Sequence, residues 1–479
     1  MIFNSRRAAQ LAYILLSVFP AGLHAQRIVV ASSFPGADLG AQIVAADAGL
    51  GANPGMIVIN QQGKITSHFV LAAGHSLELQ APTTWLAGID LLGGNTISCS
   101  GEKALMTVAL PSQGTLLRAT QVRGVQVDGC WMRTTNPGGD YYLMTALATA
   151  QIAIKNCHSQ DLPLLHTGTT GKNEEDMTPA SMSSGIVVSG NSVSLPSPAW
   201  QGKQATGVLL VFSRDAEVSG NSFQGGSHGV QWWGGDANRK AGQMQQSRRL
   251  SDLRITGNTC RDVRGACYWG SWAQHVSITH NSAENCGDVC IDAEGNNDVT
   301  IADNTVKDGH NGGIATFFFN RDITITHNQV TSSSWKYPLF KIFNSSQAPF
   351  LNQNIKVTDN NFRCEDPARF CLVIYQAVGG FVFSGNKLLD TLLLPAAQQT
   401  NTEISRNTFV LDRSAPEAVT VIRASHQING GVERVSGNVI QAQAPQPAGS
   451  VCLYPDRGSP PAEVSGNTCS GQIAAGVMR

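Results

Sequence analysis

The stretch Val188-Ser-Gly-Asn191 recurs along most of the chain and decides its fold. Each copy has a β-forming residue, a polar residue, a small or polar residue and then asparagine. The later copies occupy residues 218–221, 255–258, 278–281, 301–304, 325–328, 357–360, 383–386, 404–407, 435–438 and 464–467. Successive asparagines are mostly 21 to 32 residues apart. That period is typical of solenoid proteins.

The length of each unit predicts how the units associate. A strand of three to five residues that ends at a turn cannot bury its apolar face alone. Stacking coil on coil gives every backbone group a partner at a spacing of about 4.8 Å. The Val, Ile and Phe positions then form inward columns, and the turn asparagines can form a ladder of amide hydrogen bonds. No coil carries an amphipathic helical stripe, so we predict an all-β solenoid, a single-stranded parallel β-helix.

The start of the solenoid is expected to carry a cap, because an open end would expose strand edges and core. Leu39–Leu50 has apolar residues at helical spacing, which predicts a short capping helix. Ile57–Ile59 and Phe69–Leu71 have the pattern of the first strands. We therefore expect an N-terminal segment with a capping helix at residues 26–55 and one β-helix domain at residues 56–479.

The first 25 residues have the pattern of a secretory signal peptide. Arg6 and Arg7 precede a short apolar run, Leu11–Phe19, and Ala25 supplies a small residue for cleavage. No later segment reaches about 18 uninterrupted apolar residues, so we expect no membrane span in the mature chain. The expected localisation is extracytoplasmic, either secreted or periplasmic.

Composition narrows the partners and the chemistry. Charged residues make up 14% of the chain and the net charge is −1, so the basic surface of a nucleic-acid binder is missing. The 11 cysteines suit an oxidising compartment. Close pairs such as Cys364 with Cys371, or Cys286 with Cys290, could form disulfides that staple loops. Because the number of cysteines is odd, at least one thiol is free or pairs with another molecule. Neither a CxxC nor an HExxH motif occurs in the sequence, so no motif indicates a zinc site.

Three features together resemble the pectin-lyase-like superfamily of right-handed β-helices. They are Phe34-Pro-Gly-Ala-Asp-Leu-Gly-Ala-Gln-Ile43, the following Gly55-Met-Ile-Val-Ile59 and the repeated units that end in asparagine. The resemblance covers roughly residues 34–479 and implies a right-handed helix. It does not imply one chemistry, because the superfamily includes lyases, hydrolases, epimerases and adhesins that are not enzymes. The motifs of its known enzymes are absent, so no family catalytic residue can be transferred.

Aligning consecutive coils on their asparagines predicts one shared outer face. Val230, Tyr268, Ile291 and Ile314 then point into the core, because side chains alternate along a strand. The residues predicted to point outward on neighbouring rungs are Gln231, Trp233, Trp269, Ser271, Asp292, Glu294 and Phe317. The next two coils are expected to add Lys341 and Tyr375. Exposed aromatic residues and carboxylates converge at this place.

This set of residues fits sugar chemistry. Aromatic rings stack on the apolar faces of sugars. Asp292 and Glu294 lie two residues apart, or roughly 6.6 Å along a strand. They could serve as acid and base in glycoside hydrolysis, with either stereochemical outcome. The alternatives are a solvated surface pair, or a calcium site shared with Asp288 or Asp298.

Flanking segments add further candidate residues. The insertion between Gly234 and Leu253 holds Asp236 and Arg239 and would overhang the same sheet. A basic loop there could bind the carboxylates of uronic acids. His228 is a further candidate for substrate binding; His310 could also donate a proton, although histidines in turns are more often structural.

The sequence leaves two functional hypotheses. The first is a secreted polysaccharide-active enzyme, either a glycoside hydrolase with Asp292 and Glu294 or a polysaccharide lyase with Lys341 as base. Trp233, Trp269, Asp236, Arg239, His228, Phe317 and Tyr375 would bind the substrate. The second is a glycan-binding or surface-structural β-helix without catalysis. The expected partner is a polysaccharide, including polymers that contain uronic acid; no cofactor is required, and Ca²⁺ is the one alternative. The oligomeric state is not predicted.

Overall fold

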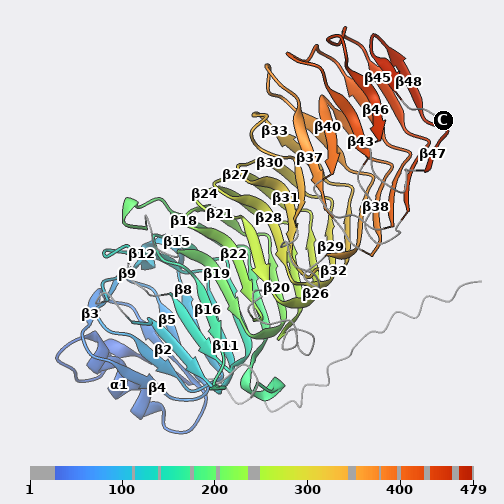
Figure 1. Ribbon diagram of the computed structural model, residues 1–479. Helices are drawn as coiled ribbons and strands as arrows, with labels where there is room; N and C mark the ends of the chain where they lie inside the picture. The colour runs from blue at the N-terminus through green and yellow to red at the C-terminus, as the bar shows by residue number, and fades with distance from the viewer. Residues whose placement is uncertain are drawn as a thin grey trace, which may run out of the picture.

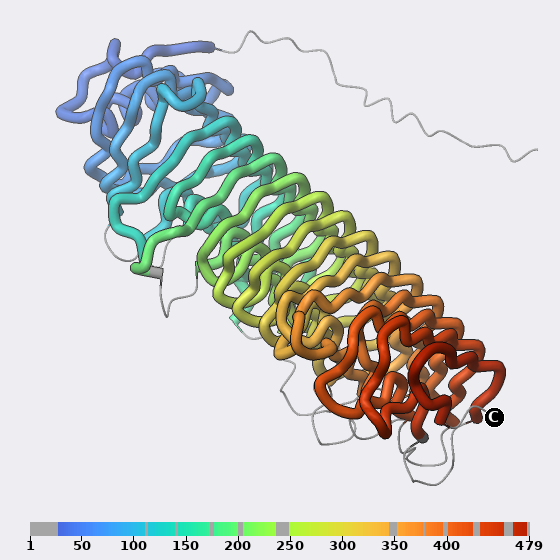
Figure 2. Tube along the Cα trace, turned by 90° about the horizontal axis from the view of Figure 1, so that it is seen from above, coloured from blue at the N-terminus to red at the C-terminus, as the bar shows by residue number. Residues whose placement is uncertain are grey.

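The protein is described by a computed structural model that covers residues 27–110, 114–138, 142–172, 177–200, 205–235, 249–343, 352–376, 379–395, 401–424, 432–455 and 463–476. The predicted signal peptide, residues 1–25, lies outside these ranges. The chain winds coil on coil into an elongated solenoid (Figure 1), and the stacking of successive coils is clearest along the Cα trace (Figure 2). The predicted parallel β-helix is confirmed.

Each coil contributes one strand to each of three parallel sheets, which we call A, B and C. Within the described residues, sheet A has 17 strands: β1 (Arg27–Val30), β2 (Gly55–Ile59), β5 (His75–Leu79), β8 (Asn95–Cys99), β11 (Arg123–Asp128), β14 (Ala150–Lys155), β17 (Ser183–Ser189), β20 (Ser213–Ser219), β23 (Leu250–Thr256), β26 (Ala273–Thr279), β29 (Asn297–Ala302), β32 (Arg321–Thr326), β35 (Gln353–Thr358), β38 (Phe381–Ser384), β41 (Thr402–Ser405), β44 (Glu433–Ser436) and β47 (Glu463–Ser465).

Sheet B has 16 strands over the same described ranges: β3 (Gly63–Ile65), β6 (Thr83–Trp85), β9 (Met106–Val108), β12 (Trp131–Thr134), β15 (His158–Gln160), β18 (Ser192–Leu195), β21 (Ser222–Gly225), β24 (Thr259–Val263), β27 (Ser282–Cys286), β30 (Thr305–Gly309), β33 (Gln329–Ser332), β36 (Asn361–Cys364), β39 (Lys387–Leu389), β42 (Thr408–Leu411), β45 (Val439–Ala442) and β48 (Thr468–Gly471).

Sheet C, which carries the candidate site, also has 16 strands in the part of the chain that is described: β4 (Phe69–Leu71), β7 (Ile89–Leu91), β10 (Leu117–Thr120), β13 (Met144–Leu147), β16 (Leu165–Gly168), β19 (Thr206–Val211), β22 (His228–Trp233), β25 (Tyr268–Ser271), β28 (Val289–Glu294), β31 (Gly312–Phe317), β34 (Phe340–Phe343), β37 (Cys371–Tyr375), β40 (Thr391–Pro395), β43 (Thr420–Ala424), β46 (Val451–Pro455) and β49 (Ala474–Gly476). Short 3-10 turns occur at η1 (Ala31–Ser33), η2 (Gly101–Ala104), η4 (Pro179–Ser181) and η5 (Pro198–Trp200).

The turn asparagines form the ladder that the repeat predicts. At each rung the side-chain oxygen accepts from the backbone and side-chain amides of the preceding asparagine, as between Asn304 and Asn281 at 2.9 and 3.1 Å. The ladder runs without a break through Asn191, Asn221, Asn258, Asn281, Asn304, Asn328, Asn360, Asn386, Asn407, Asn438 and Asn467. Because the ladder residues other than the terminal Asn467 are buried, each bond forms in a site of low dielectric, where a missing partner is costly.

The N-terminal cap is the predicted helix α1 (Leu39–Leu50), which begins where the Asp38 side chain accepts from the Ala41 amide at 2.8 Å. Ile43 and Leu50 are among its buried residues and pack on the first coils. Before the helix, β1 pairs with β2 in parallel. The sequence pattern did not predict this strand, because Arg27–Val30 lies outside the repeat. The described part of the chain contains no helix that is long and apolar enough to cross a membrane.

Five disulfides join cysteines within or between adjacent coils: Cys99–Cys130, Cys260–Cys267, Cys286–Cys290, Cys364–Cys371 and Cys452–Cys469. The two pairs predicted as staples are thus confirmed. Cys157 is the free cysteine and is buried; burial raises the pKa of its thiol to about 11. Three of the disulfides close the corner between a sheet B strand and the next sheet C strand.

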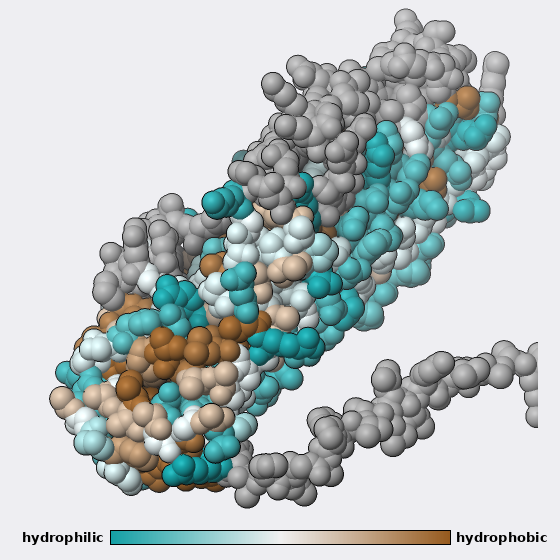
Figure 3. Space-filling model, turned by 90° about the horizontal axis from the view of Figure 1, so that it is seen from below, coloured by the Kyte–Doolittle hydropathy of each residue, from teal (hydrophilic) through white to brown (hydrophobic). Residues whose placement is uncertain are grey.

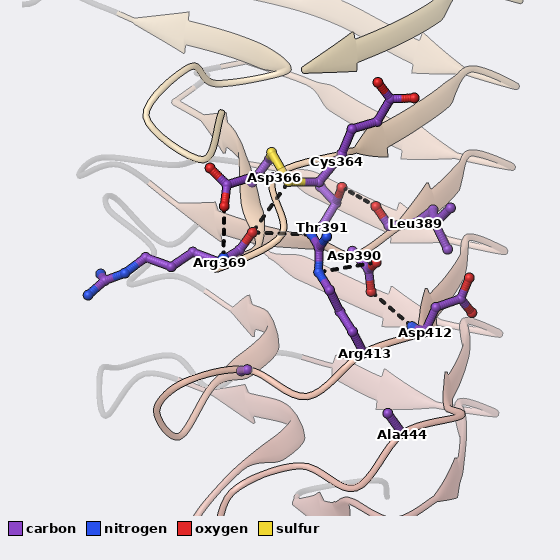
Figure 4. A network of polar contacts seen from close by, with 12 residues as sticks. Cys364, Asp366, Arg369, Leu389, Asp390, Thr391, Asp412, Arg413 and Ala444 are labelled. Carbon is purple, nitrogen blue, oxygen red and sulfur yellow. Dashed lines mark hydrogen bonds and ion pairs between the residues drawn. A yellow bond between two sulfur atoms is a disulfide. The ribbon is translucent and has the colours of Figure 1, made fainter. Parts of the chain in front are cut away.

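The corner at Cys364–Cys371 shows how polar groups fix such a turn (Figure 4). The Asp366 side chain accepts from the amides of Ala368 and Arg369 at 2.8 and 3.0 Å. Arg413, from a later coil, donates to the Arg369 carbonyl at 3.2 Å and lies 3.4 Å from Asp390. Burial raises the pKa of Asp390 even though Arg413 acts in the opposite direction. This network ties three successive coils together.

Candidate functional site

The outer face of sheet C has the register that the sequence predicted between β22 and β34. One column contains Gln231, Trp269, Asp292, Ala315 and Lys341 on successive strands. The next column contains Trp233, Ser271, Glu294, Phe317 and Phe343. The inward residues Val230, Tyr268, Ile291 and Ile314 are fully buried. The alternation of side chains is therefore confirmed, and Asp292 and Glu294 lie on the outer face.

Asp292 is the most unusual residue of this face. Its side chain points outward, yet only 4% of the residue is exposed. Its Oδ1 atom has no hydrogen-bond partner among the described residues. Burial raises its pKa well above the ordinary value, the charges of Glu294 and Asp288 act in the same direction, and Lys341 opposes them. Asp292 therefore retains a proton at a pH where an ordinary aspartate has lost it.

Glu294 lies two residues along the same strand and is only half-buried. The two carboxyl groups share one face at a backbone separation of roughly 6.6 Å, but their surroundings differ. Asp292 is enclosed and has a raised pKa, whereas Glu294 reaches the surface. This is the kind of division between two carboxyl groups that acid–base chemistry requires.

Aromatic rings flank the carboxyl pair on both sides along the sheet. On the N-terminal side, Trp233 and Trp269 are half-buried and meet edge to face, with ring centroids 6.5 Å apart. On the C-terminal side, Phe317 and Phe343 lie 6.4 Å apart. Phe343 is 42% exposed, whereas Phe317 is only 9% exposed. Trp233 and Trp269 occupy outward positions in the sheet register, as the coil alignment predicted.

His228 packs against this aromatic cluster. Its ring stacks on Trp269 with centroids 5.2 Å apart. His228 Nδ1 lies 3.1 Å from both the amide nitrogen and the carbonyl oxygen of Ala266, and the tautomer of the ring decides whether Nδ1 accepts or donates. Burial lowers the pKa of His228, although the hydrogen bond to Ala266 acts in the opposite direction, and the lowered pKa favours the neutral ring. His310 is exposed and stacks instead on Tyr337 at 4.3 Å.

Lys341 is held beside the carboxyl pair by a chain of polar contacts that the sequence analysis missed. Its Nζ donates to Asn311 Oδ1 at 3.1 Å, and Asn311 Nδ2 donates to Asp288 Oδ1 at 2.9 Å. The ammonium also lies 5.6 and 5.4 Å from the ring centroids of Phe317 and Phe343. Asn311 and Asp288 are equivalent corner positions, 23 residues apart. Extending the coil alignment beyond the strands would have found this pair.

Three predicted residues do not join the described site. Tyr375 faces the core: it is fully buried, stacks on Phe381 at 5.2 Å and donates to Glu433 at 2.8 Å. The prediction that it lies on the outer face is wrong, because Lys341 pairs with Ile374 rather than with Tyr375. Asp236 and Arg239 lie outside the described residues.

Metal ligands are not grouped in the described residues. Across these ranges, no three His, Cys, Asp or Glu side chains lie together in a way that could hold a metal ion. Asp288 is engaged by Asn311, and the exposed Asp298 lies within ion-pair distance of His275, at 3.9 Å. Neither joins Asp292 and Glu294 in a cluster of oxygen ligands.

The protein is thus a right-handed parallel β-helix that carries a carboxyl pair and aromatic residues on the outer face of one sheet. Residues 182–362 match the family model of the right handed beta helix region, and the resemblance to pectin-lyase-like β-helices is confirmed for the fold. No curated protein matches the chain. Among solved structures, the chain is similar to the tailspike protein of E. coli bacteriophage HK620. A variant of that protein in complex with a hexasaccharide has a TM-score of 0.56 at 11% identity, over 85% of this chain and 73% of the tailspike chain. A double variant with a pentasaccharide has a TM-score of 0.49 at 11% identity over the same shares of the two chains.

Proposed function

We propose that this protein is an exported polysaccharide-active enzyme, a glycoside hydrolase that works on the outer face of sheet C. The observation that carries the proposal is the unequal pair of carboxyl groups, with Asp292 enclosed and Glu294 half-exposed. A buried acid beside a second carboxylate, in a site with aromatic residues, is the arrangement that glycoside hydrolysis uses.

Each carboxyl group has a role that follows from its surroundings. Asp292, kept protonated by burial and by neighbouring negative charge, donates its proton to the glycosidic oxygen as the bond to the anomeric carbon breaks. Glu294 acts as the carboxylate that either activates water or attacks the anomeric carbon. Water supplies the hydroxyl of the new reducing end and returns a proton to the pair. Trp233, Trp269 and Phe343 provide ring faces for the sugar units on either side.

The comparisons support the substrate class by analogy. The tailspike structure with the same fold is a complex with a hexasaccharide, and a parallel sheet with a long outer face suits a polymer. A fold shared at 11% identity does not transfer chemistry, so the assignment depends on Asp292 and Glu294. The predicted signal peptide supports the proposal of export, and no metal takes part in the proposed steps.

Glycan binding without turnover is the second candidate, and the low exposure of Asp292 favours it. A carboxyl group that is only 4% exposed has little access to the glycosidic oxygen of a bound glycan. The same aromatic rings would then hold the glycan, without proton transfer from Asp292.

A substrate panel separates these functions. We would incubate the purified mature chain with plant, algal and bacterial polysaccharides and follow reducing ends together with the ultraviolet absorbance of unsaturated uronates. The expected result is a rise in reducing ends alone, lost by at least about a hundredfold in Asp292→Asn and in Glu294→Gln. Asp215→Asn, an exposed aspartate on β20, is the matched control and should retain activity. Full activity in the Asp292→Asn, Glu294→Gln double variant would contradict the assignment, and an absorbance rise would indicate a lyase.

A further inference from the structure

A pocket lies on the outer side of sheet C, near the N-terminal cap and far from the carboxyl pair. It has a volume of about 360 Å³, within the range of pockets that hold small ligands. Its lining comes from three successive coils and includes Leu86, Leu110, His68, Asp90 and Arg118. None of these residues belongs to the site described above.

The polar side of the pocket is a preorganised cluster. Arg118 donates to Asp90 through two nitrogens, at 2.7 and 2.9 Å. His68 Nε2 lies 3.3 Å from the same carboxylate. Partial burial acts to raise the pKa of Asp90, but the hydrogen bonds from Arg118 and His68 lower it overall. The cluster therefore holds a fixed carboxylate, and guanidinium N–H groups that Asp90 does not use remain as donors.

The pocket lining also has an aliphatic part. Leu86 is 38% exposed and Leu110 is almost fully buried. Val70, which pairs with Asp90 in the sheet register, is also exposed. Apolar residues gather over these N-terminal coils on the face seen from below (Figure 3).

These two sides specify an amphipathic, uncharged ligand. The charges of Arg118 and Asp90 cancel, so a charged ligand group would find no opposite charge left over. A ligand edge that carries vicinal hydroxyls can donate to Asp90 and accept from Arg118 or His68 at the same time. The C–H face of a pyranose ring can then lie against Leu86 and Leu110.

The pocket also has a fixed relation to the candidate active site. Asp90 and Asp292 stand in one continuous column of sheet C, through Arg118, Thr145, His166, Leu209, Gln231 and Trp269. Eight strands, β7 to β28, give seven steps between them. At about 4.8 Å a step, the separation is roughly 34 Å. A glycan that lies along the sheet can reach both places.

We propose that the pocket of His68, Asp90 and Arg118 is a distal binding site for an uncharged sugar unit of the same polysaccharide. It would anchor a long chain while another part of that chain occupies Asp292 and Glu294. This inference rests on the proposed function only for the identity of the polymer. The binding itself needs no turnover.

Affinity electrophoresis tests the distal site without relying on catalysis. The full chain would run in native gels that contain xylan, galactomannan or dextran as uncharged probes, and the dissociation constant would come from the retardation at each concentration. We expect at least one probe to retard the wild type, and Arg118→Ala and Leu86→Asp to weaken this binding by about tenfold or more. Both residues are exposed, so these variants should fold. Arg214→Ala, an exposed arginine on β20 of sheet A, is the control and should bind like the wild type.

The outcomes separate the two proposals. Arg118-dependent retardation that persists in the Asp292→Asn, Glu294→Gln double variant supports the distal site, even if the substrate panel shows no turnover. Retardation that is unchanged in both Arg118→Ala and Leu86→Asp overturns the distal site, as does the absence of retardation by all three probes. In either of those cases, turnover on the panel would leave the proposed hydrolase standing.

Discussion

Asp292 is expected to lower the stability of the protein at neutral pH, and replacing it with asparagine should raise that stability. An aspartate has an ordinary pKa of about 3.9, and in the folded chain burial raises this pKa well above that value. Between the two values the folded state binds a proton that the unfolded state does not. The free energy of unfolding therefore falls as the pH rises through this window and is constant above it. Asparagine has no proton to bind, so its variant lacks this loss.

The size of the effect is bounded by the pKa shift. Each unit of increase corresponds to about 1.4 kcal/mol. If Asp292 is still protonated at pH 7, the free energy of unfolding has fallen by about 4 kcal/mol at that pH, which is the upper bound of the loss. For a chain of this length, 1 kcal/mol changes the Tm by about 1 °C. Asp292→Asn should therefore raise the Tm at pH 7 by about 1 to 4 °C relative to its effect near pH 3.5.

Thermal unfolding from pH 3.5 to pH 8, at one scan rate, measures this difference. Asp215→Asn is the matched control, because Asp215 is exposed on β20, and it should give no such growth with pH. The reasoning is refuted if the Tm difference between Asp292→Asn and the wild type is the same at pH 3.5 and pH 7, or shrinks as the pH rises. The same variant should lose turnover, so stability and activity are expected to change in opposite directions.

Two further predictions concern the ladder and the charges around the site. Asn360→Ala removes the partner of two buried Asn328 donors and the donor to the Ile325 carbonyl, so three groups lose a partner. At about 1 to 3 kcal/mol per unsatisfied group, it should lower the free energy of unfolding by roughly 3 to 9 kcal/mol in denaturant titrations. The neighbouring Asn361 is exposed, and Asn361→Ala should change this free energy by less than about 0.5 kcal/mol. Lys341 lowers the pKa of Asp292 and Asp288 raises it. In pH–rate profiles, Lys341→Met should therefore move the alkaline limb to higher pH by on the order of 1 unit, and Asp288→Asn should move it to lower pH. Shifts of both variants in the same direction would count against the role of Asp292 as the acid.

The sequence predicts the architecture well because the asparagine repeat carries its own register. Where strands follow the asparagines at nearly constant spacing, as from β22 to β31, every outward residue is predicted correctly. The prediction fails at Tyr375. Strand β37 reads Cys-Leu-Val-Ile-Tyr and is apolar on both faces, so its alternation holds no signal. The pairings of Phe340 with Val373 and of Lys341 with Ile374 fix the register.

The sequence also cannot give the depth of an outward residue. Gln231, Ser271 and Asp292 all point away from the core, yet each is at least 96% buried. Alternation along a strand says which way a side chain points, whereas burial depends on what neighbouring rungs place beside it. The enclosure of Asp292 between Trp269 and later rungs arises from several coils together, and so does its raised pKa.

The strand that carries the carboxyl pair is held at both ends, and this explains how it retains an unsatisfied acid. At its start, Cys286–Cys290 closes the corner directly before Ile291. At its end, Asn296 accepts from the Ala273 amide at 2.8 Å and donates to the Gly270 carbonyl at 3.0 Å, and Asn320 continues this second ladder on the next coil. A loosely held strand could rotate a buried carboxyl group toward water and lower its pKa. Because both ends are fixed, Asp292 keeps its enclosed position, and the free energy that this costs is supplied by the ladders and the core of the neighbouring coils.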